Sequence, residues 1–198
     1  LPPTPVFAGF GLIALLLLSS PVAVLAEWTL DNDASSLAYI TTKANAAAEV
    51  NHFEYLSGSI DDAGDALLEI DLNSVNTLVE IRDDRMRDIL FETGTYPTAT
   101  ASMKVDMSAV RSLGVGQTTA VTGEAILNLR DTEVSLTASL LVVRLAENRL
   151  LVSTNKPLIV NASQVGLLAG IEKLRELAGL PSISPAVPVT LSLVFEKT

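Results

Sequence analysis

Cysteine is absent from the 198-residue sequence, histidine and tryptophan occur once each, and aromatic residues make up only 5%. Without cysteine the chain has no disulfide and no thiolate ligand, and with His52 as its only imidazole a zinc or iron–sulfur site is not expected. A protein of this length therefore has to depend on its hydrophobic core for stability.

Positive charge is also scarce, because 13 Lys and Arg residues face 23 Asp and Glu residues and leave a net charge of −10. Nucleic-acid binding needs a basic surface, so no nucleic-acid partner is expected. Electrostatic docking on anionic lipid is disfavoured for the same reason.

Residues 1–26 contain no charge, and their apolar run from Phe7 to Leu18 is shorter than the roughly 20 residues that span a bilayer. The length suits the apolar region of a signal peptide, and Val24-Leu25-Ala26 supplies small residues for cleavage, although a basic n-region is missing. We expect a signal peptide over 1–26 and a periplasmic domain over 27–198 without stable membrane insertion after cleavage. An uncleaved membrane anchor is the alternative.

Alternation of apolar and polar residues dominates the rest of the chain and predicts β-strands. The expected strands are Leu37–Thr42, Phe53–Ile60, Leu68–Leu72, Ala99–Met107, Val121–Arg130, Val134–Val142, Leu150–Thr154 and Val189–Phe195. This count predicts an all-β domain with minor helices, an antiparallel lipocalin-like barrel of about eight strands.

Two segments have helical spacing instead. Residues 163–178 place leucines and Ile171 on one face, with Ser163 as the expected N-cap and Gly179 as the expected end. The charged stretch 79–91 predicts a short amphipathic helix.

Support for catalysis is weak. His52 lies in a predicted strand without a serine or cysteine elbow, and a locally bonded strand histidine explains it better than a catalytic base. The pairs Asp61-Asp62 and Asp83-Asp84 are adjacent in sequence, and the first precedes a turn. Because phosphate-binding and metal-binding motifs are missing as well, we expect no enzyme.

Four sequence elements follow one another in a fixed order. They are Trp28-Thr29-Leu30-Asp31, the strand Asn51-His52-Phe53-Glu54-Tyr55-Leu56-Ser57-Gly58, the turn Ser74-Val75-Asn76-Thr77, and the run from Arg82-Asp83 through Leu90-Phe91 to Tyr96-Pro97-Thr98. Their order and spacing resemble the YceI-like family of exported lipid-binding barrels. The resemblance implies structural roles for Trp28, Asp31, Gly58, Ser74, Thr77, Arg82, Asp83, Tyr96 and Pro97.

The chain departs from the family pattern at five positions. Asn51 stands for glycine, Arg85 for histidine, Met86 for leucine, and Leu56 and Leu90 for aromatic residues. The last two positions belong to the wall of the barrel in the family.

The charged run at 82–88 has two interpretations. Arg82, Asp83, Arg85 and Asp88 are neighbours at i+3 and i+4, so the run could be a helix with local ion pairs of about 0.2–0.5 kcal/mol each. Alternatively, Arg82 and Asp83 tie this connection to the barrel mouth. An Arg82→Ala variant that melts earlier but retains ligand would establish the architectural role.

The resemblance implies a barrel that takes an isoprenoid lipid, such as a polyprenol or a quinone tail, lengthwise into its bore. The aliphatic inward faces agree with such a ligand, and the bound lipid is the only cofactor-like group expected. The predicted lipid-binding residues are Phe53, Leu68, Ile70, Leu72, Phe91, Leu127, Leu129, Leu140 and Val142. The alternative is a filled barrel that acts through its surface as an envelope stress or interaction protein. The sequence leaves a homodimer open.

Overall fold

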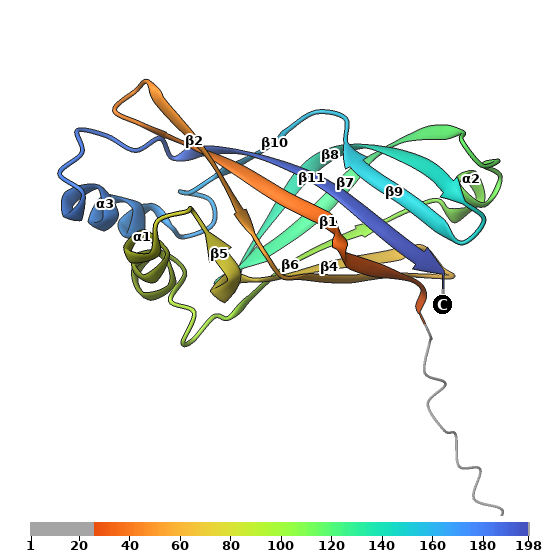
Figure 1. Cartoon of the computed structure of the whole chain (residues 1–198), viewed down its shortest axis with the longest axis horizontal. Coiled ribbons are helices and arrows are strands. Elements are labelled where there is room, and N and C mark those ends of the chain that lie inside the picture. The colour runs from red at the N-terminus through yellow and green to blue at the C-terminus, as the bar shows by residue number, and fades with distance from the viewer. Residues whose placement is uncertain (1–25, 198) are drawn as a thin grey trace, which may run out of the picture.

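The computed structural model describes residues 26–197, which form a closed antiparallel barrel (Figure 1). The predicted signal peptide lies outside the described residues except for Ala26. Going round the barrel, the eight strands are β1 (Ala26–Lys43), β3 (Leu56–Asp61), β4 (Asp65–Asp71), β6 (Thr98–Lys104), β7 (Thr118–Leu129), β8 (Thr132–Ala146), β9 (Arg149–Thr154) and β11 (Ala186–Lys197), which pairs with β1. The predicted eight-stranded barrel is confirmed.

The barrel changes its strand partners part-way along β1 and β11. β1 pairs with β3 near its start and, beyond an irregularity between Asp31 and Ser36, with β2 (Ala47–Phe53). β11 likewise pairs with β9 near its end and with β10 (Leu158–Asn161) near its start. β5 (Val75–Asn76) adds to β2. One end of the barrel is therefore built from different strands than the other.

Short helices cover both ends (Figure 1). α1 (Glu80–Arg85), the π-helix η2 (Met86–Phe91) and α3 (Leu168–Leu177) lie at the end built with β2 and β10, and α2 (Met107–Arg111) lies at the opposite end. The 3-10 turn η1 (Leu72–Ser74) follows β4. A Cβ atom at Gly170 of α3 would lie 3.1 Å from the Ile89 carbonyl oxygen, so glycine permits the close packing of α3 on η2.

Three expected elements differ from the structure. The predicted strand Phe53–Ile60 breaks at Glu54 and Tyr55, because Ser74 accepts hydrogen bonds from both backbone N–H groups through its carbonyl and hydroxyl oxygens. The predicted strand Ala99–Met107 ends at Lys104, and α2 follows under an Asp106 cap.

The predicted helix 163–178 begins at Leu168, and Ser163 donates to Asn161 in the preceding turn instead of capping it. Gly179, with φ of +63°, follows Ala178, the residue after the helix end at Leu177. β10 and α2 were not expected from the sequence.

Large buried side chains fill the α2 end of the barrel. Trp28, Leu150 and Phe195 are buried there beneath Met107 and Val110 of α2. The guanidinium of Arg144 lies 5.7 Å from the Trp28 ring centre and the Lys197 ammonium 5.9 Å from it.

Gly64 in the β3–β4 turn should be the least replaceable glycine. It has φ of +87°, and a Cβ atom would lie 2.0 Å from the Val105 carbonyl oxygen. We expect Gly64→Ala to lower the free energy of unfolding by more than 2 kcal/mol, roughly the sum of backbone strain and a steric clash. Gly116→Ala is the matched control, since φ is +80° but nothing lies within 4 Å. Equal urea midpoints for the two variants would contradict this account.

Candidate functional site

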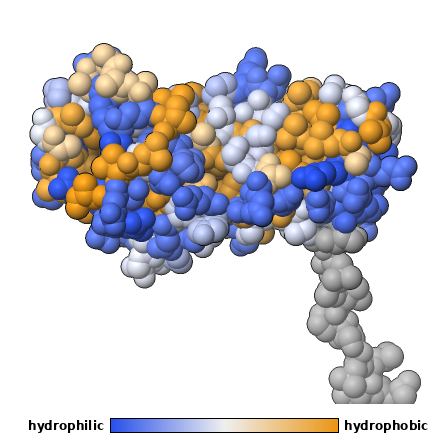
Figure 2. Space-filling view, in the orientation of Figure 1, coloured by the Kyte–Doolittle hydropathy of each residue, from blue (hydrophilic) through white to orange (hydrophobic). Residues whose placement is uncertain are grey.

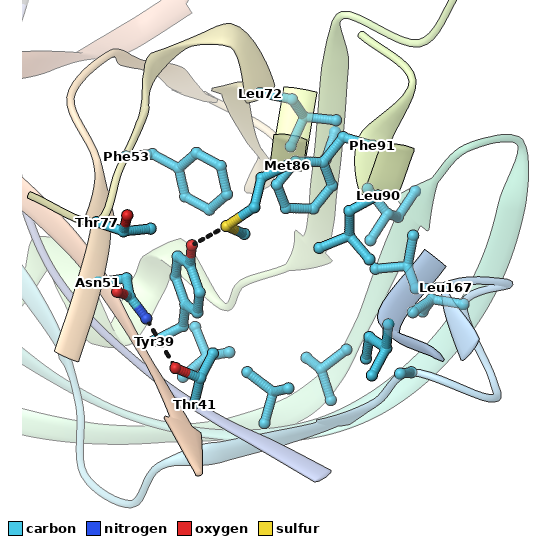
Figure 3. Close-up of a pocket in the computed structure, with 18 of the residues that line it drawn as sticks. Tyr39, Thr41, Asn51, Phe53, Leu72, Thr77, Met86, Leu90, Phe91 and Leu167 are labelled. Carbon is cyan, nitrogen blue, oxygen red and sulfur yellow. Dashed lines mark hydrogen bonds between the residues drawn. The ribbon is translucent and has the colours of Figure 1, made fainter. Parts of the chain in front are cut away.

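The half of the barrel that α1, η2 and α3 cover contains a cavity of about 360 Å³ (Figure 3). Its wall is almost entirely hydrocarbon, which is typical of sites for apolar ligands, and its size falls within the usual range for ligand pockets. Strands contribute Leu37, Tyr39, Phe53, Leu68, Ile70, Ala99, Ala101, Ala125, Leu127, Leu129, Leu136, Val187, Val189 and Leu191, and helices and connections contribute Leu72, Met86, Leu90, Phe91, Val165, Leu167, Ile171 and Leu174.

Seven of the nine predicted lipid-binding residues line this cavity. They are Phe53, Leu68, Ile70, Leu72, Phe91, Leu127 and Leu129. Their contact with a lipid stays a prediction, but their side chains share one apolar space.

Leu140 and Val142 do not line the cavity, so their assignment to its wall is corrected. Both belong to the packed interior nearer the α2 end, where Val142 pairs with Val152 and is almost fully buried. Leu136, on the same face of β8, does line the cavity. The bore is thus hollow in one half and filled in the other.

Several lining residues were not expected. β10 contributes Leu158 and Val160, α3 contributes Ile171 and Leu174, and Leu167 lies directly before α3. The helical spacing of the leucines in 163–178 was visible in the sequence, but nothing local indicated that this helix covers the bore. Leu37 and Tyr39 could have been found, because they alternate in a predicted strand.

Three aromatic rings lie together in the cavity wall (Figure 3). The Tyr39 and Phe53 ring centres are 5.4 Å apart, and those of Phe53 and Phe91 are 5.8 Å apart. Of the two positions where leucine stands for a family aromatic residue, Leu90 lines the cavity, whereas Leu56 is buried in the core away from it.

Few polar atoms reach the cavity wall. The Tyr39 hydroxyl donates to Met86 Sδ at 3.8 Å, and Asn51 Nδ2 donates to Thr41 Oγ1 at 3.1 Å. The Asn51 Oδ1 atom is buried without a hydrogen-bond partner, in a residue only 2% exposed. A buried acceptor of this kind costs free energy unless a ligand or water satisfies it.

Burial raises the pKa of the Tyr39 hydroxyl above the ordinary value of 10.0, with a further contribution from the Asp83 carboxylate and a smaller opposing one from Arg82. The folded state therefore keeps this proton at a pH where the unfolded chain loses it. The stabilisation is complete below pH 10.0 and declines as the pH rises above it. Urea melts above pH 10.0 should therefore show that the free energy of unfolding falls more in the wild type than in Tyr39→Phe, which has no hydroxyl to titrate. A constant difference between the two proteins would contradict this expectation.

The charged run does tie the helical connection to neighbouring elements. Asp83 is buried, and its Oδ1 accepts from the Thr77 backbone N–H at 2.9 Å and the Thr77 hydroxyl at 2.6 Å. Arg82 pairs with Glu49 of β2, which also pairs with Lys43, and these cations hold the pKa of Glu49 below its ordinary value.

The expected pairs among Arg82, Asp83, Arg85 and Asp88 are not among the ion pairs of residues 26–197, and the one pair formed within the run is Arg87 with Asp84. The expectation that these four residues pair with one another along the helix was therefore wrong.

Replacing Asp83 by alanine should destabilise the domain, because the Thr77 N–H and hydroxyl would lose their buried acceptor. The expected cost is about 1–3 kcal/mol. Asp84→Ala is the control, since Asp84 is exposed and its surface pair with Arg87 contributes little. Thermal melting compares the variants, and equal melting temperatures would show that the Thr77–Asp83 contact is unimportant.

The remaining residues of the four sequence elements make architectural contacts. Asp31 pairs with Arg149 of β9 at 3.1 Å. A Cβ atom added at Gly58 would lie only 2.7 Å from the Leu67 carbonyl oxygen, so this position requires glycine. Tyr96 lies under the Arg130 guanidinium, and the Pro97 carbonyl accepts from the Leu72 N–H. Trp28, Ser74 and Asp83 likewise do not line the cavity, whereas Thr77 and Arg82 do.

His52 lies on β2, where it is paired with Ala38 of β1 and Asn76 of β5. Its neighbours Asn51 and Phe53 line the cavity, so His52 points to the other face of β2. Within residues 26–197, no three acidic or histidine side chains are grouped as metal ligands would be. No helix in the same range is long and apolar enough to cross a bilayer.

Comparison with known families identifies the fold. The profile of the YceI-like domain matches residues 28–195. The chain belongs to the YceI-like family.

The YceI-like barrel is similar to a polyisoprenoid-binding domain from Saccharophagus degradans implicated in plant cell wall breakdown, with 42% identity over 88% of this chain and 100% of that one and a TM-score of 0.86. It also resembles Burkholderia cenocepacia BcnA, at 18% identity over 83% and 98% of the two chains with a TM-score of 0.62, and a mutant CJ YCEI protein, at 15% identity over 75% and 84% with a TM-score of 0.55. The last two support the fold alone. No curated protein matches the sequence significantly.

Proposed function

We propose that this YceI-like protein binds the chain of an isoprenoid lipid in its half-barrel cavity and acts as a periplasmic carrier. The observation that carries the proposal is the hollow, hydrocarbon-walled space of about 360 Å³ inside the barrel. The 42% identical Saccharophagus degradans domain, which binds polyisoprenoid, supports the choice of lipid.

The energetics of such a site favour a hydrocarbon chain. Burying each CH₂ group contributes about 0.8 kcal/mol, so a few isoprene units are enough for micromolar affinity before ordering costs. Aliphatic side chains from the strands and α3 can pack around methyl branches. The cavity does not support the alternative of a filled barrel.

The polar end of the lipid would lie beside Asn51 and Thr41. These residues supply the unpartnered Asn51 oxygen and a hydroxyl, so a terminal alcohol could donate to Asn51. The cavity does not extend to Trp28, Leu150 and Phe195 at the α2 end.

The proposal that the protein is exported rests on the uncharged, apolar sequence of residues 1–26. N-terminal sequencing of the protein recovered from a periplasmic fraction should begin at Glu27. Recovery of the unprocessed chain in the cytoplasm would contradict the periplasmic assignment.

Titration of the domain with geranylgeraniol, followed by isothermal calorimetry, tests the binding proposal. We expect saturation at one ligand per protein with micromolar or tighter affinity. Octanol is the control for nonspecific apolar binding and should bind much more weakly. A folded protein that shows no heat with geranylgeraniol and does not take up a quinone would overturn the proposal.

A further inference from the structure

Apolar side chains are exposed at the end of the barrel that α1 and α3 cover (Figure 2). In the segment that leads from β5 into α1, Leu78 is 84% exposed, Ile81 58% and Val79 38%. Val79 and Ile81 also line the cavity. The same side chains therefore face both solvent and the cavity, and they form a continuous apolar path between the two. We call Leu78, Val79 and Ile81 the apolar rim.

Leu78 has an unusual backbone for an exposed leucine. Its φ of +61° lies in the left-handed region, which glycine and asparagine adopt more readily than leucine. The Leu78 backbone N–H donates a hydrogen bond to Asn76 Oδ1 at 2.8 Å. The side chain thus projects into solvent from a disfavoured backbone conformation and contributes little to the core. Such a position is more easily explained by a contact outside the domain.

Lysine and arginine side chains lie beside the apolar rim, together with the exposed carboxylate of Glu80. Arg82 and Lys43 share the carboxylate of Glu49. Arg85 lines the same opening and has no acidic partner among residues 26–197. Exposed leucine and isoleucine next to arginine suit the boundary of a phospholipid layer, where apolar side chains enter the acyl region and guanidinium groups lie at the phosphates.

We propose that the apolar rim docks reversibly on the surface of a phospholipid bilayer, so that the cavity mouth faces the membrane and the isoprenoid passes between them without crossing water. This inference rests on the proposed function. Three rim side chains are too few for stable insertion, and the net charge of −10 opposes a purely electrostatic attachment. The docking is therefore expected to be brief and to depend on apolar contact.

The test uses vesicles of equimolar phosphatidylethanolamine and phosphatidylglycerol that carry a fluorophore-tagged geranylgeraniol and a membrane-bound quencher. Transfer to the protein relieves the quenching. At fixed vesicle concentration, docking predicts that the first-order rate constant of transfer rises in proportion to protein concentration. A rate constant independent of protein concentration would mean that the isoprenoid first leaves the vesicle into water, and it would overturn the proposal.

Leu78→Asn is the informative variant, because asparagine tolerates the left-handed backbone and Leu78 is not part of the cavity wall. We expect the variant to fold, to bind free geranylgeraniol as the wild type does, and to show a transfer rate about tenfold lower. Val115→Asn is the matched control, an exposed apolar residue outside the cavity wall, and it should transfer at the wild-type rate. Equal rates for wild type and Leu78→Asn would overturn the docking.

Two further readouts separate the possible failures. If the wild type binds no isoprenoid in vesicle-free titration, the proposed function fails. Docking is then tested separately by vesicle flotation, in which a smaller floating fraction of Leu78→Asn than of the wild type supports it and equal fractions overturn it. If sedimentation shows a dimer that Leu78→Asn dissociates while vesicle binding is unchanged, a second copy covers the apolar rim and the membrane proposal is wrong.

Discussion

Leu127→Trp is expected to weaken geranylgeraniol binding about a hundredfold, which corresponds to about 2.7 kcal/mol. Leu127 lies on β7 with its side chain in the cavity, so an indole there occupies space that the isoprenoid would otherwise fill. The cavity can accept the larger side chain, and the usual cost of overpacking, about 1–3 kcal/mol, should be reduced. Calorimetric titration measures the affinity, and circular dichroism verifies the fold.

The neighbouring residue provides the control for this variant. Ile126 is exposed on the outer face of β7, and Ile126→Trp should bind geranylgeraniol like the wild type. If a folded Leu127→Trp protein retains full affinity, the isoprenoid does not occupy the described cavity near β7.

Trp28→Ala should have the largest effect on stability of any single truncation. Trp28 is 1% exposed in the packed half of the barrel, so its removal leaves a large void and separates Arg144 and Lys197 from the ring they cover. Truncation of a buried tryptophan costs about 3–5 kcal/mol. Ligand retention per folded molecule should be unchanged, because Trp28 does not line the cavity.

Trp28→Phe is the graded comparison. It retains an aromatic ring and removes the indole Nε1, which is buried without a hydrogen-bond partner. Its loss of stability should therefore be well below that of Trp28→Ala. Since this is the only tryptophan, urea denaturation is followed by circular dichroism rather than fluorescence. A Trp28→Ala protein as stable as the wild type, or one that folds but binds no ligand, would contradict the division into a packed half and a hollow half.

Strand alternation separated the two faces of each strand, but it indicated neither which face turns inward nor how deep each residue lies along the bore. Leu127 and Val142 have the same alternating context, yet one lines the cavity and the other is packed in the core. Depth follows from the pairing of strands, such as Leu127 opposite Val134 and Val142 opposite Thr119. That register depends on the barrel as a whole, so a single strand does not reveal it.

The helical cover was only partly predictable. The spacing in 163–178 indicated an amphipathic helix, but its packing on η2 depends on Gly170 meeting Ile89 and Leu90, which lie far away in sequence. In the charged run, the π-helix that begins at Met86 changes which side chains are neighbours at i+3 and i+4, and local pairing depends on that spacing. Arg82 pairs instead with Glu49, which lies 33 positions away in the sequence.

The most direct test of the central claim is mass spectrometry of lipid extracted from the protein after purification without detergent. The hollow, apolar half of the barrel predicts an isoprenoid lipid in the organic extract at close to one molecule per protein, and its loss from the Leu127→Trp variant. An empty extract from folded wild-type protein that also takes up no added polyprenol or quinone would contradict the claim that the cavity is an isoprenoid site.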